Sequence, residues 1–235
     1  MATVPGGDYI YDGGGSGGSQ PVVLPIVVAS NEQGQILDSL FQSTLGTANV
    51  SQTTAANGTV ILKGSNGETV KVFSDQNKGT SVKGILTKND GAVIGTPTNK
   101  SVTVQAGAGA NQVVVTANSK TTIGLAGGND KITLATDGLG SSNVSLGTGR
   151  DTVVVSSEFL GNAVIKDFSK QDKLQILDRG KDGKVEAGKD YTYYKQGKDT
   201  VLVLLKDGKE TNKITLKNVK TSKVDVSDDG ILTIS

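Results

Sequence analysis

Residues 123–155 read IGLAGGNDKITLATDGLGSSNVSLGTGRDTVVV and contain two copies of one pattern. In each copy a glycine-containing turn ends at an aspartate, Asp130 or Asp151, and apolar residues follow two and four positions later. A further apolar residue lies seven positions before each aspartate. Apolar residues that alternate with polar ones on both sides of a turn predict two short strands per copy, each with one buried face.

The pattern extends over residues 101–177. Asn111 and Asp172 occupy the aspartate position in two further copies, 19 residues before Asp130 and 21 residues after Asp151. A repeat of about 20 residues predicts a parallel β-roll or β-helix, in which like residues stack at the inter-strand spacing of about 4.8 Å. The apolar columns of this stack are Val104, Ile123, Val144 and Ile165; Val113, Ile132, Val153 and Leu174; and Val115, Leu134, Val155 and Ile176.

The whole sequence predicts an all-β chain with four parts. They are a Gly-rich arm with an apolar donor-like strand (1–30), a β-rich N-terminal region with one short helix at 32–45 (31–100), the β-roll (101–177) and an antiparallel β cap (178–235). The pattern leaves open whether residues 31–100 form a separate domain or the first irregular coils. Asp90 lies 21 residues before Asn111, but Lys83 and the small Ala92 weaken the apolar columns there.

The composition excludes several kinds of chemistry. Among the 235 residues there are 32 Gly, no His and no Cys. This chain therefore has no disulfide, no thiolate metal site and no His-dependent catalytic triad. The net charge of +1, with Arg only at Arg150 and Arg179, argues against a nucleic-acid partner.

The hydropathy of the chain argues against membrane insertion, because no segment approaches the roughly 18–20 apolar residues of a membrane span. The first residues also lack a basic segment. We therefore expect a protein that stays in the cytoplasm or is exported without an N-terminal signal peptide.

The turns at 126–130 and 147–151 resemble the G-G-x-G-x-D-x-U-x repeats of the RTX nonapeptide family. Residues 164–174 look like the sequence that closes such rolls, and the acidic stretch 225–229 before an apolar end is similar to type I export signals. A last β-strand is the alternative reading of that end. The sequence departs from the family where Asn111 replaces Asp and where the turn before Asp172 has no Gly. The resemblance implies a calcium β-roll that is secreted to the cell surface or beyond. The length of the chain and its lack of His argue against a toxin or protease domain.

Calcium has a physical reason to bind this repeat. Like charges stacked at about 4.8 Å repel by about 3–4 kcal/mol at an effective dielectric near 20. A Ca²⁺ ion between coils relieves this repulsion, since it takes about 6–8 oxygens from carboxylates and from the carbonyls of Gly-rich turns. The alternative is a metal-free coil whose aspartates are solvated at exposed turns. The candidate ligands are Asn111, Gly128, Asn129, Asp130, Gly149, Asp151, Asp167 and Asp172, with the Asp130–Asp151 layer as the strongest site.

An apolar strand after a flexible arm is typical of donor-strand exchange between copies. Head-to-tail donation that does not close produces filaments, whereas packing on its own domain is the alternative. The candidate assembly residues are Val22, Val23, Leu24, Ile26, Val27 and Val28.

Three classes of function follow from these patterns. The sequence favours a secreted calcium-binding structural protein that self-assembles into a head-to-tail homopolymer, as a filament, surface layer or matrix. The alternative is a monomeric adhesin or carbohydrate-binding module that contacts a cell surface or polysaccharide through Tyr191, Tyr193 and Tyr194. An enzyme is a third class, and no carboxylate pair or Lys–Tyr constellation stands out for it.

Overall fold

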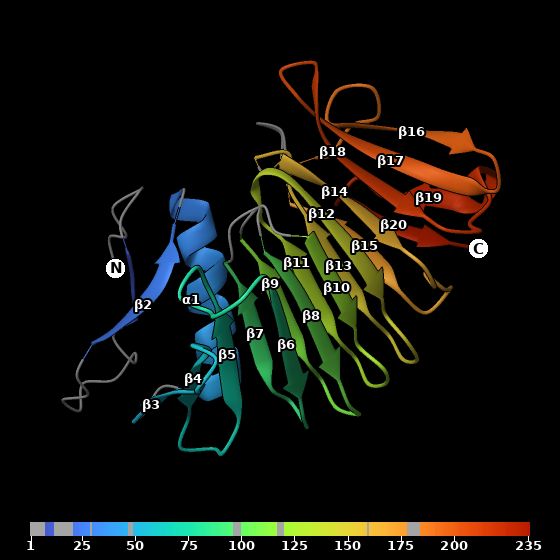
Figure 1. Cartoon of the computed structure of the whole chain (residues 1–235). Helices are drawn as coiled ribbons and strands as arrows, with labels where there is room; N and C mark the ends of the chain where they lie inside the picture. Colours follow the sequence, from blue (N-terminus) through green and yellow to red (C-terminus); the bar gives the residue numbers. More distant parts are fainter. Residues whose placement is uncertain are drawn as a thin grey trace.

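The computed structural model describes residues 8–11, 21–28, 30–46, 49–95, 100–116, 120–158, 160–177 and 184–235, and Figure 1 shows their arrangement. The chain is mostly β, and it winds into a parallel β-solenoid of about five turns with about 21 residues per turn. Antiparallel strands follow at the C-terminal end, and one helix lies near the N-terminus. The predicted fold class is therefore confirmed.

Two long sheets form the walls of the solenoid (Figure 1). The eight-stranded sheet has the spatial order β16 (Tyr191–Gln196), β17 (Asp199–Lys206), β18 (Lys209–Leu216), β14 (Leu160–Ile165), β12 (Asp137–Ser145), β10 (Lys120–Gly124), β8 (Ser101–Ala106) and β6 (Ser81–Leu86). The ten-stranded sheet has the order β19 (Val224–Val226), β20 (Ile231–Ile234), β15 (Lys173–Ile176), β13 (Thr152–Val155), β11 (Lys131–Leu134), β9 (Gln112–Val115), β7 (Gly91–Ile94), β5 (Thr69–Phe73), β4 (Val60–Lys63) and β3 (Ser51–Thr54).

Parallel register places the predicted apolar columns inside the solenoid. Ile132 pairs with Val113 on one side and with Val153 on the other, and Ile123 pairs in the same way with Val104 and Val144. All twelve residues of the three columns are buried. The repeat predicted the core because in-register parallel pairing brings each residue over its equivalent in the next coil.

The solenoid begins before residue 101. Strand β5 pairs in parallel with β7, and β6 pairs in parallel with β8, so residues 69–95 and 100–106 belong to the first coils. The weak apolar pattern there has a steric cause. Gly84, and not Lys83, pairs with Val104 of the apolar column. A Cβ on Gly84 would lie 2.3 Å from Cζ of Phe73, so this ring fills the space that the Val104 side chain fills in the next coil.

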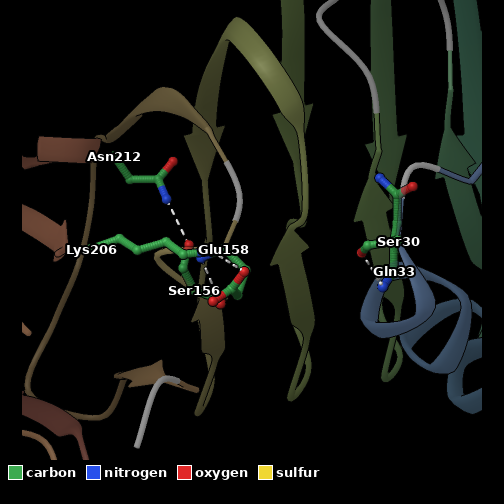
Figure 2. A network of polar contacts seen from close by, with 6 residues as sticks. All are labelled: Ser30, Gln33, Ser156, Glu158, Lys206 and Asn212. Carbon is green, nitrogen blue, oxygen red and sulfur yellow. Dashed lines mark hydrogen bonds and ion pairs between the residues drawn. The ribbon is translucent and has the colours of Figure 1, made fainter. Parts of the chain in front are cut away.

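The C-terminal cap extends both sheets with antiparallel strands. Strands β16 and β17 continue the eight-stranded sheet beyond β18, and β19 and β20 continue the ten-stranded sheet. The apolar end of the chain thus forms a last strand. Figure 2 shows how the cap is fastened to the loop after β13: Asn212 donates to the Ser156 carbonyl at 2.7 Å, and Lys206 pairs with Glu158.

Helix α1 (Asn31–Leu45) packs on the outer face of the ten-stranded sheet, where it contacts β5, β7 and β9. The helix predicted at 32–45 is therefore confirmed. The Ser30 hydroxyl caps its first turn by accepting the Gln33 N–H (Figure 2). The buried Gln33 side chain then donates to the carbonyls of Thr116 and Ala135, at 3.1 and 2.7 Å, where β9 and β11 end.

This glutamine makes a stability test. The Gln33→Leu variant is expected to lower the free energy of unfolding by about 1–3 kcal/mol, because two buried strand-end carbonyls lose a donor. The Gln35→Leu variant is the matched control, since Gln35 is exposed on the same helix. Urea unfolding followed by circular dichroism measures both. Equal midpoints for the two variants would show that Gln33 does not fasten the helix.

Strands β1 (Asp8–Tyr11) and β2 (Val22–Val27) form a small antiparallel sheet that packs on α1. The rings of Tyr9 and Tyr11 lie 5.5 and 5.0 Å from that of Phe41, measured between centroids. Within the described ranges, no helix is both long and apolar enough to cross a membrane.

Candidate functional site

The acidic column consists of Asn111, Asp130, Asp151 and Asp172. Each of these residues precedes a strand of the ten-stranded sheet, and those strands pair in register, so the four residues stack. Their exposed fractions are 0%, 1%, 1% and 2%. The predicted stacking is confirmed. The alternative in which water solvates the aspartates at exposed turns is wrong, because these side chains are buried.

One oxygen of each aspartate fastens its coil to the preceding coil. Oδ1 of Asp130 accepts the Asn111 N–H at 2.7 Å, and Oδ1 of Asp151 accepts the Asp130 N–H at 2.8 Å. Oδ1 of Asp172 accepts the Asp151 N–H at 3.0 Å. When the carboxyl groups are ionised, these bonds pair an anionic acceptor with a backbone donor and are stronger than neutral ones. They give the aspartates a structural role that needs no metal.

The second oxygens differ along the column. Oδ2 of Asp172 accepts the Ser169 N–H at 2.7 Å. In contrast, Oδ2 of Asp130, Oδ2 of Asp151 and Oδ1 of Asn111 are buried and find no hydrogen-bond partner in the part of the chain that the structure describes. A buried oxygen without a donor is costly, and more so when it carries charge. Three successive coils therefore hold buried oxygens that lack a hydrogen-bond donor or a cation, and the two carboxylate oxygens among them can also be protonated.

The protonation of the column reflects this environment. Burial raises the pKa of Asp130 to about 7. The hydrogen bond from the Asn111 N–H lowers this pKa, and the nearby charge of Asp151 raises it further. Burial likewise raises the pKa of Asp151 to about 6, with contributions from the charges of Asp172 and Asp167. At neutral pH the two carboxyl groups are thus close to their titration points when no cation is bound.

A parallel column of glycines sets how closely the coils stack. Gly109, Gly128 and Gly149 have φ of 137°, 131° and 137°. A Cβ on Gly128 would lie 2.0 Å from the Gly109 carbonyl oxygen, and a Cβ on Gly149 would lie 1.6 Å from that of Gly128. The predicted ligands Gly128 and Gly149 therefore hold positions that no other residue can occupy.

The turn carbonyls also link coils through the backbone. The Gly127 carbonyl accepts the Gly109 N–H at 3.0 Å, and the Thr148 carbonyl accepts the Gly128 N–H at 2.9 Å. Each carbonyl oxygen keeps a second lone pair. These carbonyl oxygens can thus bind a cation only through the second lone pair, while they keep accepting the backbone N–H.

Asn129 and Asp167 lie outside the column. Oδ1 of Asn129 accepts the Arg150 N–H at 3.0 Å. Both oxygens of Asp167 accept backbone N–H groups, from Leu146 at 2.8 Å and from Gly147 at 3.1 Å. Both side chains are exposed. The structure therefore separates these two predicted ligands from the stacked four and gives each of them a turn-stabilising contact.

Asp90 belongs to the same column, and the sequence marked it only by its distance of 21 residues from Asn111. Its carboxylate is buried and accepts four hydrogen bonds, from the N–H and hydroxyl groups of Thr69 and Thr87. Although burial opposes it, these bonds hold the pKa of Asp90 below its usual range. The column is thus satisfied at its two ends and unsatisfied in the middle.

The middle of the column offers three buried oxygens that have no hydrogen-bond partner among the described residues. Among the residues that the structure describes, no group of three or more His, Cys, Asp or Glu could hold a metal ion. Asp130 and Asp151 would supply one free carboxylate oxygen each, and Asn111 an amide oxygen. Turn carbonyls or water would complete the ligand set. Oxygen ligands alone suit Ca²⁺ rather than Zn²⁺.

The candidate assembly residues lie on β2 and just after it. Leu24, Ile26 and Val28 are buried against α1 and the outer face of the ten-stranded sheet. Val23 and Val27 point away and are 55% and 59% exposed, and Val22 is half-buried. Among the described strands, β2 pairs with β1 alone.

The comparisons with known proteins add no family. No protein-family model matches the chain, and no curated protein matches it. The site is therefore defined by its geometry, as a buried acidic column with three oxygens in need of a partner.

Proposed function

We propose that this chain is a secreted calcium-binding structural protein that self-assembles into an extracellular filament, surface layer or matrix. The observation that carries the proposal is the set of buried, unpartnered oxygens of Asn111, Asp130 and Asp151 in three successive coils. A cation between coils would neutralise these carboxylates while leaving their hydrogen bonds to the preceding coil intact.

The expected affinity supports an extracellular location. Sites with few charged ligands bind Ca²⁺ with dissociation constants of about 10⁻⁴–10⁻³ M, as extracellular modules do. A site with two free carboxylate oxygens belongs in this range. Such a site would fill where calcium is millimolar and stay empty in a cytoplasm. The solenoid would then gain stability on export.

The N-terminal segment supports self-assembly. Its buried residues Leu24, Ile26 and Val28 contact the helix and the sheet, not the β-solenoid core. Residues 12–20 between β1 and β2 are Gly/Ser-rich, which suits an exchangeable arm. The same contacts made on a neighbouring copy would join subunits at no loss of buried area.

A cysteine pair tests strand exchange, because the natural chain has no Cys. A Cβ on Gly95 would lie 3.3 Å from Cβ of Ile26, close to disulfide geometry. Ile26→Cys with Gly95→Cys, oxidised in millimolar calcium, is expected to give a ladder of covalent multimers on a non-reducing gel. Each single variant is the control. A product that is only an internally linked monomer would show that the arm packs on its own chain.

Calcium binding is tested separately by melting temperature. Millimolar Ca²⁺ added to chelator-treated protein is expected to raise the melting temperature, with a midpoint of about 0.1–1 mM. Asp151→Ala is expected to lose most of this rise, and Asp167→Ala to keep it, since both Asp167 oxygens already have partners. A rise that survives intact in Asp151→Ala would place the ion elsewhere.

A further inference from the structure

A cationic groove lies in the C-terminal cap, where the turn between β16 and β17 meets the segment after β18. It encloses about 580 Å³, and the short helix η1 (Thr221–Lys223) contributes to one side. Three lysines line it, Lys195, Lys198 and Lys220, together with the polar side chains of Asn218, Thr221 and Ser222. No residue of the acidic column lies in this groove.

These lysines differ from most others in the cap. Lys184, Lys189, Lys206, Lys213 and Lys217 each pair with a carboxylate. Within the described ranges, the side-chain amines of Lys195, Lys198 and Lys220 make no hydrogen bond or ion pair. Asp199, whose carboxylate accepts the N–H of the groove residue Asn218, is paired with Lys217. The three lysines therefore give the groove a net positive charge that suits an anionic ligand.

An aromatic ring lies on the same strand face as one of these lysines. Side chains alternate along a strand, so Tyr191, Tyr193 and Lys195 share one face of β16, and Tyr194 lies on the other. Tyr191 is buried, and its ring stacks on that of Tyr193 at 6.4 Å with an angle of 9°. Tyr193 is 36% exposed, so part of its ring remains free for a ligand.

We propose that this groove binds an acidic polysaccharide, a polymer of uronic acids. Its carboxylates would pair with Lys195, Lys198 and Lys220, and the apolar face of one sugar ring would pack on Tyr193. The hydroxyl groups of Thr221 and Ser222 and the amide group of Asn218 can both donate to and accept from sugar hydroxyls. The proposal goes beyond calcium binding and assembly, since it assigns the protein a means of attachment to a glycan.

The test measures binding of oligogalacturonate to the full-length protein by calorimetry. Chelator is present throughout, so that the acidic column has no part in the result, and low salt of about 50 mM preserves the charge contribution. The combined variant Lys195→Gln, Lys198→Gln and Lys220→Gln is expected to bind at least about tenfold more weakly. Lys131→Gln, Lys173→Gln and Lys209→Gln, combined, make the same change in net charge at exposed sites outside the groove and should alter affinity less than about twofold.

A pair of tyrosine variants separates sugar recognition from charge alone. Tyr193→Ala is expected to weaken binding about three- to tenfold, and Tyr194→Ala to leave it unchanged, because the two rings lie on opposite faces of β16. A neutral maltooligosaccharide should not bind. Equal loss in the two lysine variants, equal binding of polyglutamate or single-stranded DNA, or no binding of oligogalacturonate would each overturn the proposal.

Discussion

Replacement of Gly149 by alanine is expected to lower the free energy of unfolding by more than about 3 kcal/mol, enough to unfold much of the solenoid. The added Cβ would lie 1.6 Å from the Gly128 carbonyl oxygen, which belongs to the backbone of the preceding coil and cannot move aside alone. The φ of 137° is also strained for any residue with a side chain. Urea unfolding followed by circular dichroism measures the loss.

Two glycines provide matched controls for this prediction. Gly208 has a φ of +71° and no atom within 4 Å of an added Cβ, so Gly208→Ala measures backbone strain alone, at about 1 kcal/mol. Gly124 has open space and no such φ, so Gly124→Ala should have almost no effect. If Gly149→Ala unfolds at the same urea concentration as Gly208→Ala, the coils do not stack as closely as the structure has them.

Calcium-free protein is expected to lose stability as the pH rises from about 4 to about 8. In the unfolded chain an aspartate ionises near its ordinary pKa of 3.8, whereas burial raises the pKa to about 7 for Asp130 and to about 6 for Asp151. Between these values the folded state binds more protons than the unfolded state, so stability falls with pH. This contribution to stability is lost by the time the pH passes the folded pKa values.

The Asp130→Asn variant tests this pH dependence. An amide has the shape of the carboxyl group and keeps an oxygen to accept the Asn111 N–H, but it carries no charge. In chelator at about pH 8 the variant is expected to be more stable than the natural protein, by about 1–3 kcal/mol, with a flatter pH profile. Asp167→Asn is the control and should give no gain, since Asp167 is exposed.

Calcium should make the natural protein more stable than Asp130→Asn at about pH 8. Millimolar Ca²⁺ is expected to stabilise the natural protein more at about pH 8 than at about pH 5, because the ion competes with protons for the same carboxylates. It should stabilise Asp130→Asn less at either pH. If the calcium-free natural protein is equally stable at both pH values, folding does not raise the pKa values of Asp130 and Asp151.

The sequence by itself determined the solenoid, because in-register parallel pairing converts a repeat along the chain into a stack in space. The apolar columns, the stacked aspartates and the helix at 32–45 follow from spacing alone, and the structure has each of them. The glycines of the turns were recognisable for the same reason. The sequence did not reveal why glycine is required there, because the clash of a side chain with the preceding coil depends on the distance between coils.

Only the tertiary structure decided the features that depend on residues far apart in the chain. The ring of Phe73 occupies the space beside Gly84, so a glycine interrupts the apolar column of β6 between Val82 and Leu86. The burial of Asp130 and Asp151 follows from how the coils close, and so does the division of their oxygens into bonded and unpartnered. The groove joins Lys195 and Lys198 to Lys220 across a turn and a loop. Spacing along a chain fixes which residues share a column, whereas burial, steric contact and unpaired charge arise only when separate segments meet.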